Sequence, residues 1–149
     1  MFFDIIKKKA LENGMSEILT IKEKYKNDFL YTRSGEGCEE FLAPADIEGT
    51  YYFKDIVYSD ESRGWWKPSA HCSRILNLLC SGGEIKLRED EAFRERMIGA
   101  LRFWLIKDLR CPNWWFNQIS VAGCIASISL LLEPYLDEDM RAGVERIIL

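Results

Sequence analysis

The feature that most constrains the fold is a helical spacing of apolar residues, which is clearest after Asp90. The apolar positions there fall three or four residues apart, at Phe93, Met97, Ala100, Leu101, Trp104, Leu105 and Leu109. This spacing places them along one face of an α-helix. Pro112 marks the end of that helix, because proline cannot continue one.

Similar patterns predict further helices along most of the chain. They cover residues 2–12, 15–31, 69–80, 117–132 and the segment from 137 to the end. Strands do not alternate with helices, so nothing suggests a parallel sheet. We therefore expect a single all-α domain over residues 1–149, built of helical hairpins with short connections.

Local signals indicate where these helices begin and end. Asn13-Gly14 separates the first two, Ser69 is expected to cap the third, and Ser81-Gly82-Gly83 is expected to stop it. The predicted buried face of the second helix holds Met15, Ile18, Leu19, Lys22, Tyr25 and Phe29. The final helix keeps one face apolar up to Leu149, and we expect that face to dock on a partner.

Composition excludes several function classes. The net charge of −4 argues against a nucleic-acid partner, which needs a basic face. Five cysteines without a CxxC pair, together with a single histidine, lack the usual spacing of a zinc site. We expect no metal, no cofactor and no disulfide framework. The chain shows no signal peptide, and its longest apolar run, near residues 120–132, indicates a buried helix and no membrane partner.

Residues 38–68 show no clear period and are rich in aromatic residues, so we expect a long loop, in part a short helix. It leads into the first of two Trp-Trp pairs. Residues 58–76 read YSDESRGWWKPSAHCSRIL, and residues 111–123 read CPNWWFNQISVAG. Both pairs are predicted in loops directly before helices, where clefts form.

Exposed aromatic rings suit the apolar faces of sugars, and amides suit sugar hydroxyls. The candidate ligand-binding residues are Arg63, Trp65, Trp66, Asn113, Trp114, Trp115, Asn117 and Gln118. Lys67 and Arg74 add positive charge for a carboxylate. The alternative is that both Trp pairs only pack beneath their loops.

The second segment resembles the motif N-W-W-x-x-E/Q-I-G-x-P of polysaccharide lyase family 8, the hyaluronate, chondroitin AC and xanthan lyases. The first resembles the upstream pattern Y-x-D-x-S-R-x-x-W-x-P-x-x-H-x-x-R of that family. The matching residues are Tyr58, Asp60, Ser62, Arg63, Trp66, Pro68, His71 and Arg74. Ser120 departs from the motif where the family has Gly, and Ala122-Gly123 lie near its Pro. The resemblance spans about residues 50–140.

The resemblance implies a fold and an activity. It implies part of an incomplete (α/α) toroid, exported to the periplasm or the extracellular space, in which Trp114 and Trp115 stack on an acidic polysaccharide for β-elimination. The catalytic Asn, His and Tyr of the family follow later than this chain extends. We therefore expect an N-terminal part of the toroid that binds glycan without the catalytic set, whether truncated, split or a non-catalytic relic. The missing C-terminal part would be a partner.

Three alternatives stay open. His71 could be the base of a rearranged lyase, with Tyr58 or Tyr52 as the acid. The chain could instead be a helical interaction module whose tryptophans are packing. A glycosidase on the same toroid type would need two opposed carboxylates, and nothing singles out Asp60, Glu61 or Asp108.

Overall fold

The computed structural model describes the backbone of residues 1–149 and the side chains of all except residues 10, 12, 13 and 15–18. The α-helices are α1 (Phe2–Asn13), α2 (Met15–Tyr25), α3 (Ser69–Glu89), α4 (Glu91–Lys107), α5 (Ala122–Leu132) and α6 (Glu138–Ile148). π-Helical segments continue α2 over Lys26–Leu30 and precede α5 over Phe116–Val121, and short 3-10 turns form at Glu39–Phe41 and Glu133–Tyr135. The predicted all-α class is confirmed.

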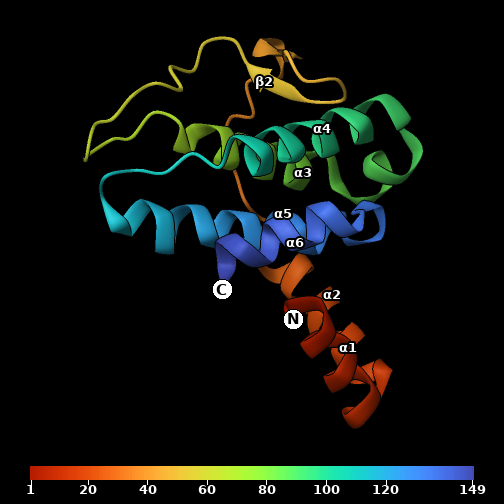
Figure 1. Ribbon diagram of the computed structural model, residues 1–149. Coiled ribbons are helices and arrows are strands. Elements are labelled where there is room, and N and C mark those ends of the chain that lie inside the picture. Colours follow the sequence, from red (N-terminus) through yellow and green to blue (C-terminus); the bar gives the residue numbers. More distant parts are fainter.

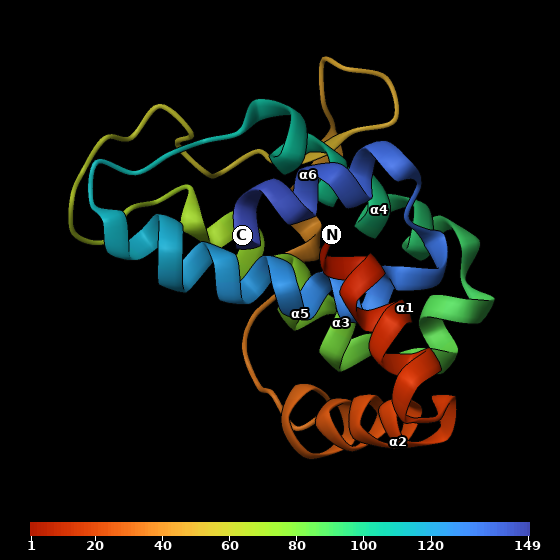
Figure 2. The same ribbon diagram turned by 60° about the horizontal axis from the view of Figure 1, so that its bottom comes forward.

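The helices pair in the order of the chain. α1 packs on α2, α3 on α4, and α5 on α6, while α3 also contacts α5 and α4 contacts α6. In Figure 1 the α3–α4 pair lies above the α5–α6 pair, and the α1–α2 pair projects below them. Figure 2, with the lower side brought forward, shows α1 and α2 beside one end of α5. The prediction of hairpins with short connections therefore holds for α3–α4 and α5–α6.

The core lies between these pairs, and its largest fully buried side chains belong mostly to α3, α4 and α5. They include Ile75, Phe93, Met97, Leu101, Trp104, Ile125, Ile128 and Leu132. α6 adds Met140 and Val144, which are also buried. The apolar face of the last helix packs against α4 and α5, while Leu149 at its end is exposed, and docking of this helix on a partner stays a prediction.

Residues 38–68 contain a small antiparallel hairpin that the sequence did not predict. β1 (Leu42–Pro44) pairs with β2 (Tyr51–Phe53), with Ala43 opposite Tyr52. β2 packs on α4 at Gly99, where a Cβ atom would lie 2.5 Å from the Tyr51 ring and 2.8 Å from the Gly49 carbonyl oxygen. Strands of three residues are too short to show alternation, so tertiary packing on α4 creates them.

α3 is longer than predicted. Gly83 takes φ +75° and ψ 176°, which breaks the helix, and a further helical turn then runs to Glu89. The SGG stop signal was thus a kink between two helical parts and not an end. The predicted cap also shifts by one residue: Ser69 is the first helical residue, and its hydroxyl donates to the Trp66 carbonyl at 2.7 Å.

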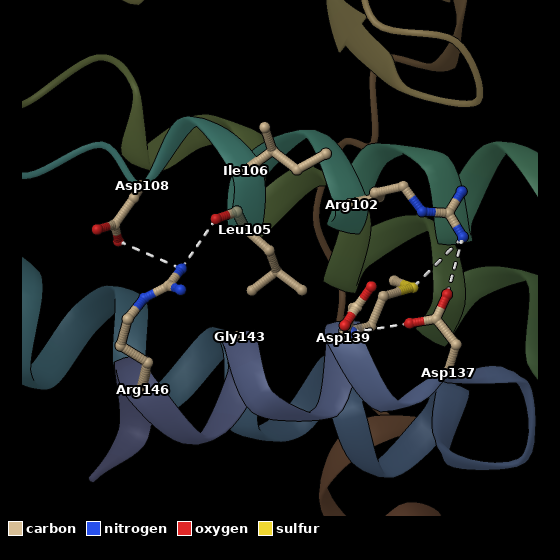
Figure 3. Close-up of a pocket in the computed structure, with 9 residues that line it drawn as sticks. Arg102, Leu105, Ile106, Asp108, Asp137, Asp139, Gly143 and Arg146 are labelled. Carbon is tan, nitrogen blue, oxygen red and sulfur yellow. Dashed lines mark hydrogen bonds and ion pairs between the residues drawn. The ribbon is translucent and has the colours of Figure 1, made fainter.

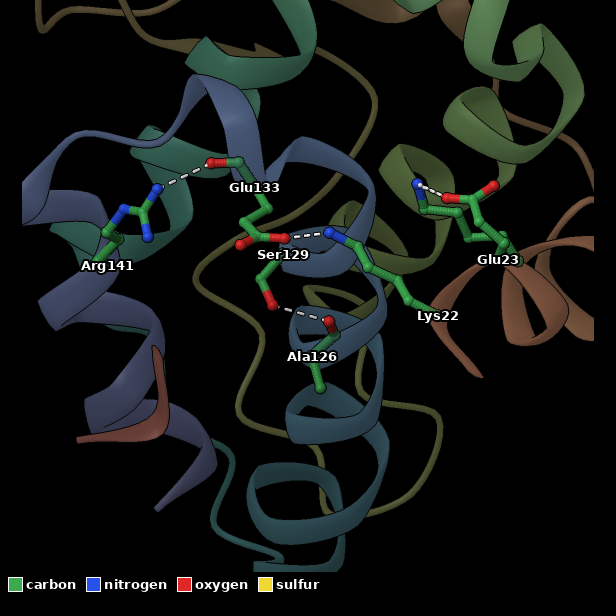
Figure 4. A network of polar contacts seen from close by, with 7 residues as sticks. Lys22, Glu23, Ala126, Ser129, Glu133 and Arg141 are labelled. Atoms are coloured by element: carbon green, nitrogen blue, oxygen red, sulfur yellow. Dashed lines mark hydrogen bonds and ion pairs between the residues drawn. The ribbon is translucent and has the colours of Figure 1, made fainter. Parts of the chain in front are cut away.

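α2 turns only part of its predicted face toward the protein. Lys22 forms an ion pair with Glu133, and Lys26 is buried and donates to Glu23 at 3.2 Å. Figure 4 shows the Lys22–Glu133 contact, with the Glu133 carbonyl also accepting from Arg141 at 3.0 Å. Leu19 and Phe29 of the predicted face are exposed. The side chains of Met15 and Ile18 lie outside those that the structure describes. Ion pairing therefore overrides apolar periodicity in this helix.

Candidate functional site

The two Trp-Trp segments, distant in sequence, meet at one end of the protein. The Asn113 side-chain amide donates to the Arg63 carbonyl oxygen at 2.9 Å, and the Cys111 thiol lies 3.6 Å from the Ser62 carbonyl oxygen. Figures 1 and 2 both show the loop before α3 running beside the segment that leads into α5. The structure therefore brings the two predicted motifs together.

Three of the four paired tryptophans face solvent. Trp65 is 95% exposed, Trp114 61% and Trp115 46%. We refer to these three as the exposed tryptophan surface. The side chains of Arg63 and Gln118 from the candidate set are also exposed, as is Lys67. Trp114 and Trp115 lie in the first helical turn that leads into α5.

Trp66, in contrast, belongs to the core, where it is 2% exposed. Its indole nitrogen donates to the Asp60 carbonyl oxygen at 2.9 Å, and its ring meets Trp104 and Phe116 edge-on, with centroids 6.0 Å apart in each case. Phe116 in turn packs edge-on against Trp115 at 5.2 Å. A row of rings thus runs from Trp104 through Trp66 and Phe116 to Trp115, and Trp66 offers no free face to a ligand.

The two asparagines of the NWWFNQ segment bind the backbone. Asn113 uses its carbonyl oxygen to accept from the Trp115 amide at 3.1 Å, in addition to its bond with Arg63. Asn117 accepts from the Cys111 amide and donates to the Cys111 carbonyl, both at 2.8 Å. These side chains hold the Trp pair at the start of the helix, whereas the side chain of Gln118 is exposed.

The backbone of Trp65 is strained. Its φ of +53° lies in the left-handed region, which a bulky residue rarely adopts. Such a conformation costs of the order of 1–3 kcal/mol and tends to persist at functional sites. A side chain that is almost fully exposed gains little burial in return, so packing does not explain why tryptophan is placed there.

The sequence singled out His71 as a candidate base, and the structure places it in the core. It is fully buried, stacked between Phe103 and Trp104 with ring centroids 5.3 and 5.5 Å away. Its Nε2 lies 2.8 Å from the Ala100 carbonyl oxygen, which can only accept, so Nε2 carries the proton. Nδ1 then accepts from the Tyr58 hydroxyl, also at 2.8 Å.

Both ring nitrogens of His71 are therefore occupied, and burial fixes the neutral form. Desolvation lowers the pKa of His71 to about 4, and desolvation also raises the pKa of Tyr58 well above its usual value. The Tyr58 oxygen itself accepts from the Phe53 amide at 2.9 Å. The pair is close enough for proton transfer, but no substrate can reach a ring nitrogen that is enclosed on all sides.

A separate groove lies between α4 and α6 (Figure 3), with a volume of about 520 Å³. Its floor is apolar, and an arginine stands near each end. Arg146 donates to the Leu105 carbonyl at 2.9 Å and lies 3.8 Å from Asp108. Arg102 donates to the Gly49 carbonyl at 3.1 Å and lies 3.6 Å from Asp137. Each arginine is thus paired with one aspartate, and Asp139 adds a third carboxylate to the lining.

Among the side chains that the structure describes, no three His, Cys, Asp or Glu residues gather closely enough to hold a metal ion. All five cysteines are free, and Cys72, Cys80 and Cys111 are buried. Burial raises the pKa of the Cys72 thiol, which makes it a poor nucleophile. These thiols act as small apolar side chains.

The helical stretch Phe116–Tyr135 is long and apolar enough, by length and composition alone, to cross a membrane. Core helices of globular proteins pass the same test. Ile125, Ile128 and Leu132 of this stretch are fully buried within the protein. One third of this stretch is buried within the protein, so core packing accounts for part of its apolar character.

Comparison of the chain with protein-family models, with curated proteins and with solved structures finds no match. The resemblance to family 8 lyases therefore stays a prediction from the two sequence motifs. Sequence reasoning missed the separation of Trp65 from Trp66 and the supporting roles of the two asparagines. Two adjacent tryptophans in a segment without periodicity do not reveal which ring points inward.

Proposed function

We propose that this chain binds an acidic polysaccharide of the hyaluronan or chondroitin type through the exposed tryptophan surface. We further propose that it is the N-terminal part of a family 8 lyase toroid, which supplies the aromatic platform and lacks the base, the acid and the carboxylate-neutralising group. On this proposal the protein acts outside the cytoplasm, where such polymers occur, and the rest of the toroid is its partner.

The observation that carries the proposal is the hydrogen bond between the Asn113 amide and the Arg63 carbonyl. It joins the loop that holds Trp65 to the helix start that holds Trp114 and Trp115. Three solvent-facing indole rings at one end of a protein present far more apolar ring area than isolated exposed residues do. Arg63 and Lys67, both exposed on the same loop, provide positive charge for uronate carboxylates.

The proposal is tested by titrating the chain with hyaluronan and chondroitin oligosaccharides while tryptophan fluorescence is recorded. We expect a saturable change in fluorescence. Trp115→Ala should weaken the affinity for the oligosaccharide by about tenfold, in line with about 1–3 kcal/mol for stacking on one aromatic residue. The matched control is Phe29→Ala, which removes an exposed aromatic residue of another element. A wild-type signal that does not saturate, or an equal loss in both variants, would refute the proposal.

A second candidate function, a helical interaction module, is favoured by α2 and its π-helical continuation. Ile21, Tyr25 and Phe29 follow one another at four-residue intervals and are all exposed, whereas Lys26 is buried. An apolar stripe turned outward in this way suits a partner helix. Replacing Ile21 and Phe29 by Ser tests this candidate function. For an interaction module, the wild type should sediment as a mixture of oligomers and the variant as a monomer. An unchanged sedimentation profile argues against it.

A further inference from the structure

The loop from Asp60 to Lys67 is closed by one carboxylate. Asp60 Oδ2 accepts from the Ser62 hydroxyl at 2.7 Å and from the Lys67 backbone amide at 3.0 Å, and Asp60 Oδ1 lies 3.3 Å from the Ser62 amide. The Asp60 carbonyl oxygen accepts the Trp66 indole proton. A single residue thus ties together the beginning, the end and the inward-facing ring of the loop.

Trp65 lies inside this closed loop, directly before Trp66 and Lys67, which both bind Asp60. Trp66 is fixed inward by its buried ring, and the Lys67 amide is fixed by the Asp60 carboxylate. Trp65 therefore connects the exposed turn to the anchored Trp66, and its backbone takes a left-handed φ. Two adjacent tryptophans consequently point in opposite directions, one to the core and one to solvent.

We propose that Asp60 is a positioning residue that fixes the outward conformation of Trp65 through these hydrogen bonds. The use of this conformation as a sugar platform rests on the proposed function; the conformational role does not. Asp60 is suited to the task because charge-assisted bonds from backbone amides and hydroxyls are shorter and stronger than neutral ones. The Ser62 hydroxyl and the Lys67 amide lower the pKa of Asp60, so the carboxylate stays charged to a lower pH than an ordinary aspartate does.

The loop carries its own reporter. Arg63 is exposed and is followed by Gly64, which makes it a site for trypsin. Cleavage there requires this part of the backbone to open, so its rate reports on the loop. We expect Asp60→Ala to speed cleavage after Arg63 by about tenfold or more, which matches the loss of at least one charge-assisted hydrogen bond. Asp60→Asn keeps one acceptor oxygen and should fall between Asp60→Ala and the wild type.

The matched control is Glu61→Ala, which removes the neighbouring exposed carboxylate that takes no part in this network. Cleavage after Arg63 should stay at the wild-type rate in that variant, and the indole NMR signal of Trp65 should move only in the Asp60 variants. Equal cleavage rates in Asp60→Ala and Glu61→Ala would overturn the proposal. Because neither readout uses a glycan, a failure of glycan binding in the separate titration would count against the proposed function alone.

Discussion

At the scale of single residues, Trp65 and Trp66 show how neighbours with the same side chain take different roles. Trp66 is buried against Trp104 and Phe116, and its indole proton has a partner. Trp65 is 95% exposed, and its backbone is strained by a left-handed φ. Packing explains the presence of Trp66, whereas it does not explain that of Trp65.

The difference gives a paired prediction for stability. Trp66→Ala should lower the free energy of unfolding by about 3–5 kcal/mol, because it leaves a large cavity in the core. Trp65→Ala should change it by no more than about 0.5 kcal/mol, because an exposed side chain away from packing contributes little. Urea unfolding followed by circular dichroism measures both. Similar losses in the two variants would show that Trp65 is packed after all.

The sequence singled out the two Trp-Trp segments, which lie together in the structure, but it did not reveal the contacts of their individual residues. Motif spacing placed Arg63 and Asn113 in one site, and they are joined by a hydrogen bond. Spacing does not reveal which amides the backbone uses, so Asn113 and Asn117 were expected to face sugar hydroxyls and instead hold the chain. Side-chain roles of this kind depend on loop geometry, which carries no periodic signal.

At the scale of elements, the sequence predicted helices well where apolar spacing and packing agree. α4 and α6 begin at residues capped by Asp90 and Asp137, whose carboxylates accept backbone amides at 3.0 and 2.8 Å. Prediction failed where a tertiary contact decided the outcome. The Lys22–Glu133 ion pair orients α2, and packing on α4 creates the β-hairpin.

The break in α3 can be tested with a pair of glycine substitutions. At Gly83 a Cβ atom meets nothing within 4 Å, so only the φ of +75° opposes a side chain. Gly83→Ala should therefore lower the free energy of unfolding by about 1–2 kcal/mol. Gly123 is helical, exposed and also free of nearby atoms.

Gly123→Ala should accordingly raise the free energy of unfolding by about 0.5–1 kcal/mol, since alanine is the better helix former. Thermal unfolding of the two variants under the same conditions compares them directly. Opposite signs are the expected result. A stabilising Gly83→Ala would mean that the helix runs on through this position without the kink.

At the scale of the whole molecule, His71 links the β-hairpin region to α4 through the Tyr58 hydroxyl and the Ala100 carbonyl. Its pKa of about 4 lies below the usual 6.5 because the charged form is desolvated. The unfolded chain then binds more protons than the folded one between these values. Folding stability should therefore fall as the pH drops from about 6.5 toward about 4.

This pH dependence can be assigned, because His71 is the only histidine in the chain. Between pH 6.5 and 5 the free energy of unfolding should decline with a slope of up to about 1.4 kcal/mol per pH unit. His71→Gln should be less stable at pH 7 and nearly flat over that interval. Urea titrations at several pH values measure both slopes. A wild-type curve as flat as that of the variant would contradict the buried, neutral state of His71.

The central claim is that three tryptophans form a glycan-binding surface and the other two support it. The most direct test is to follow the five indole N–H signals by NMR during titration with a hyaluronan oligosaccharide, assigned with single Trp→Phe variants. The account predicts that the signals of Trp65, Trp114 and Trp115 shift with one common Kd, while those of Trp66 and Trp104 stay in place. No shift at about 1 mM ligand, or shifts confined to the buried pair, would contradict it.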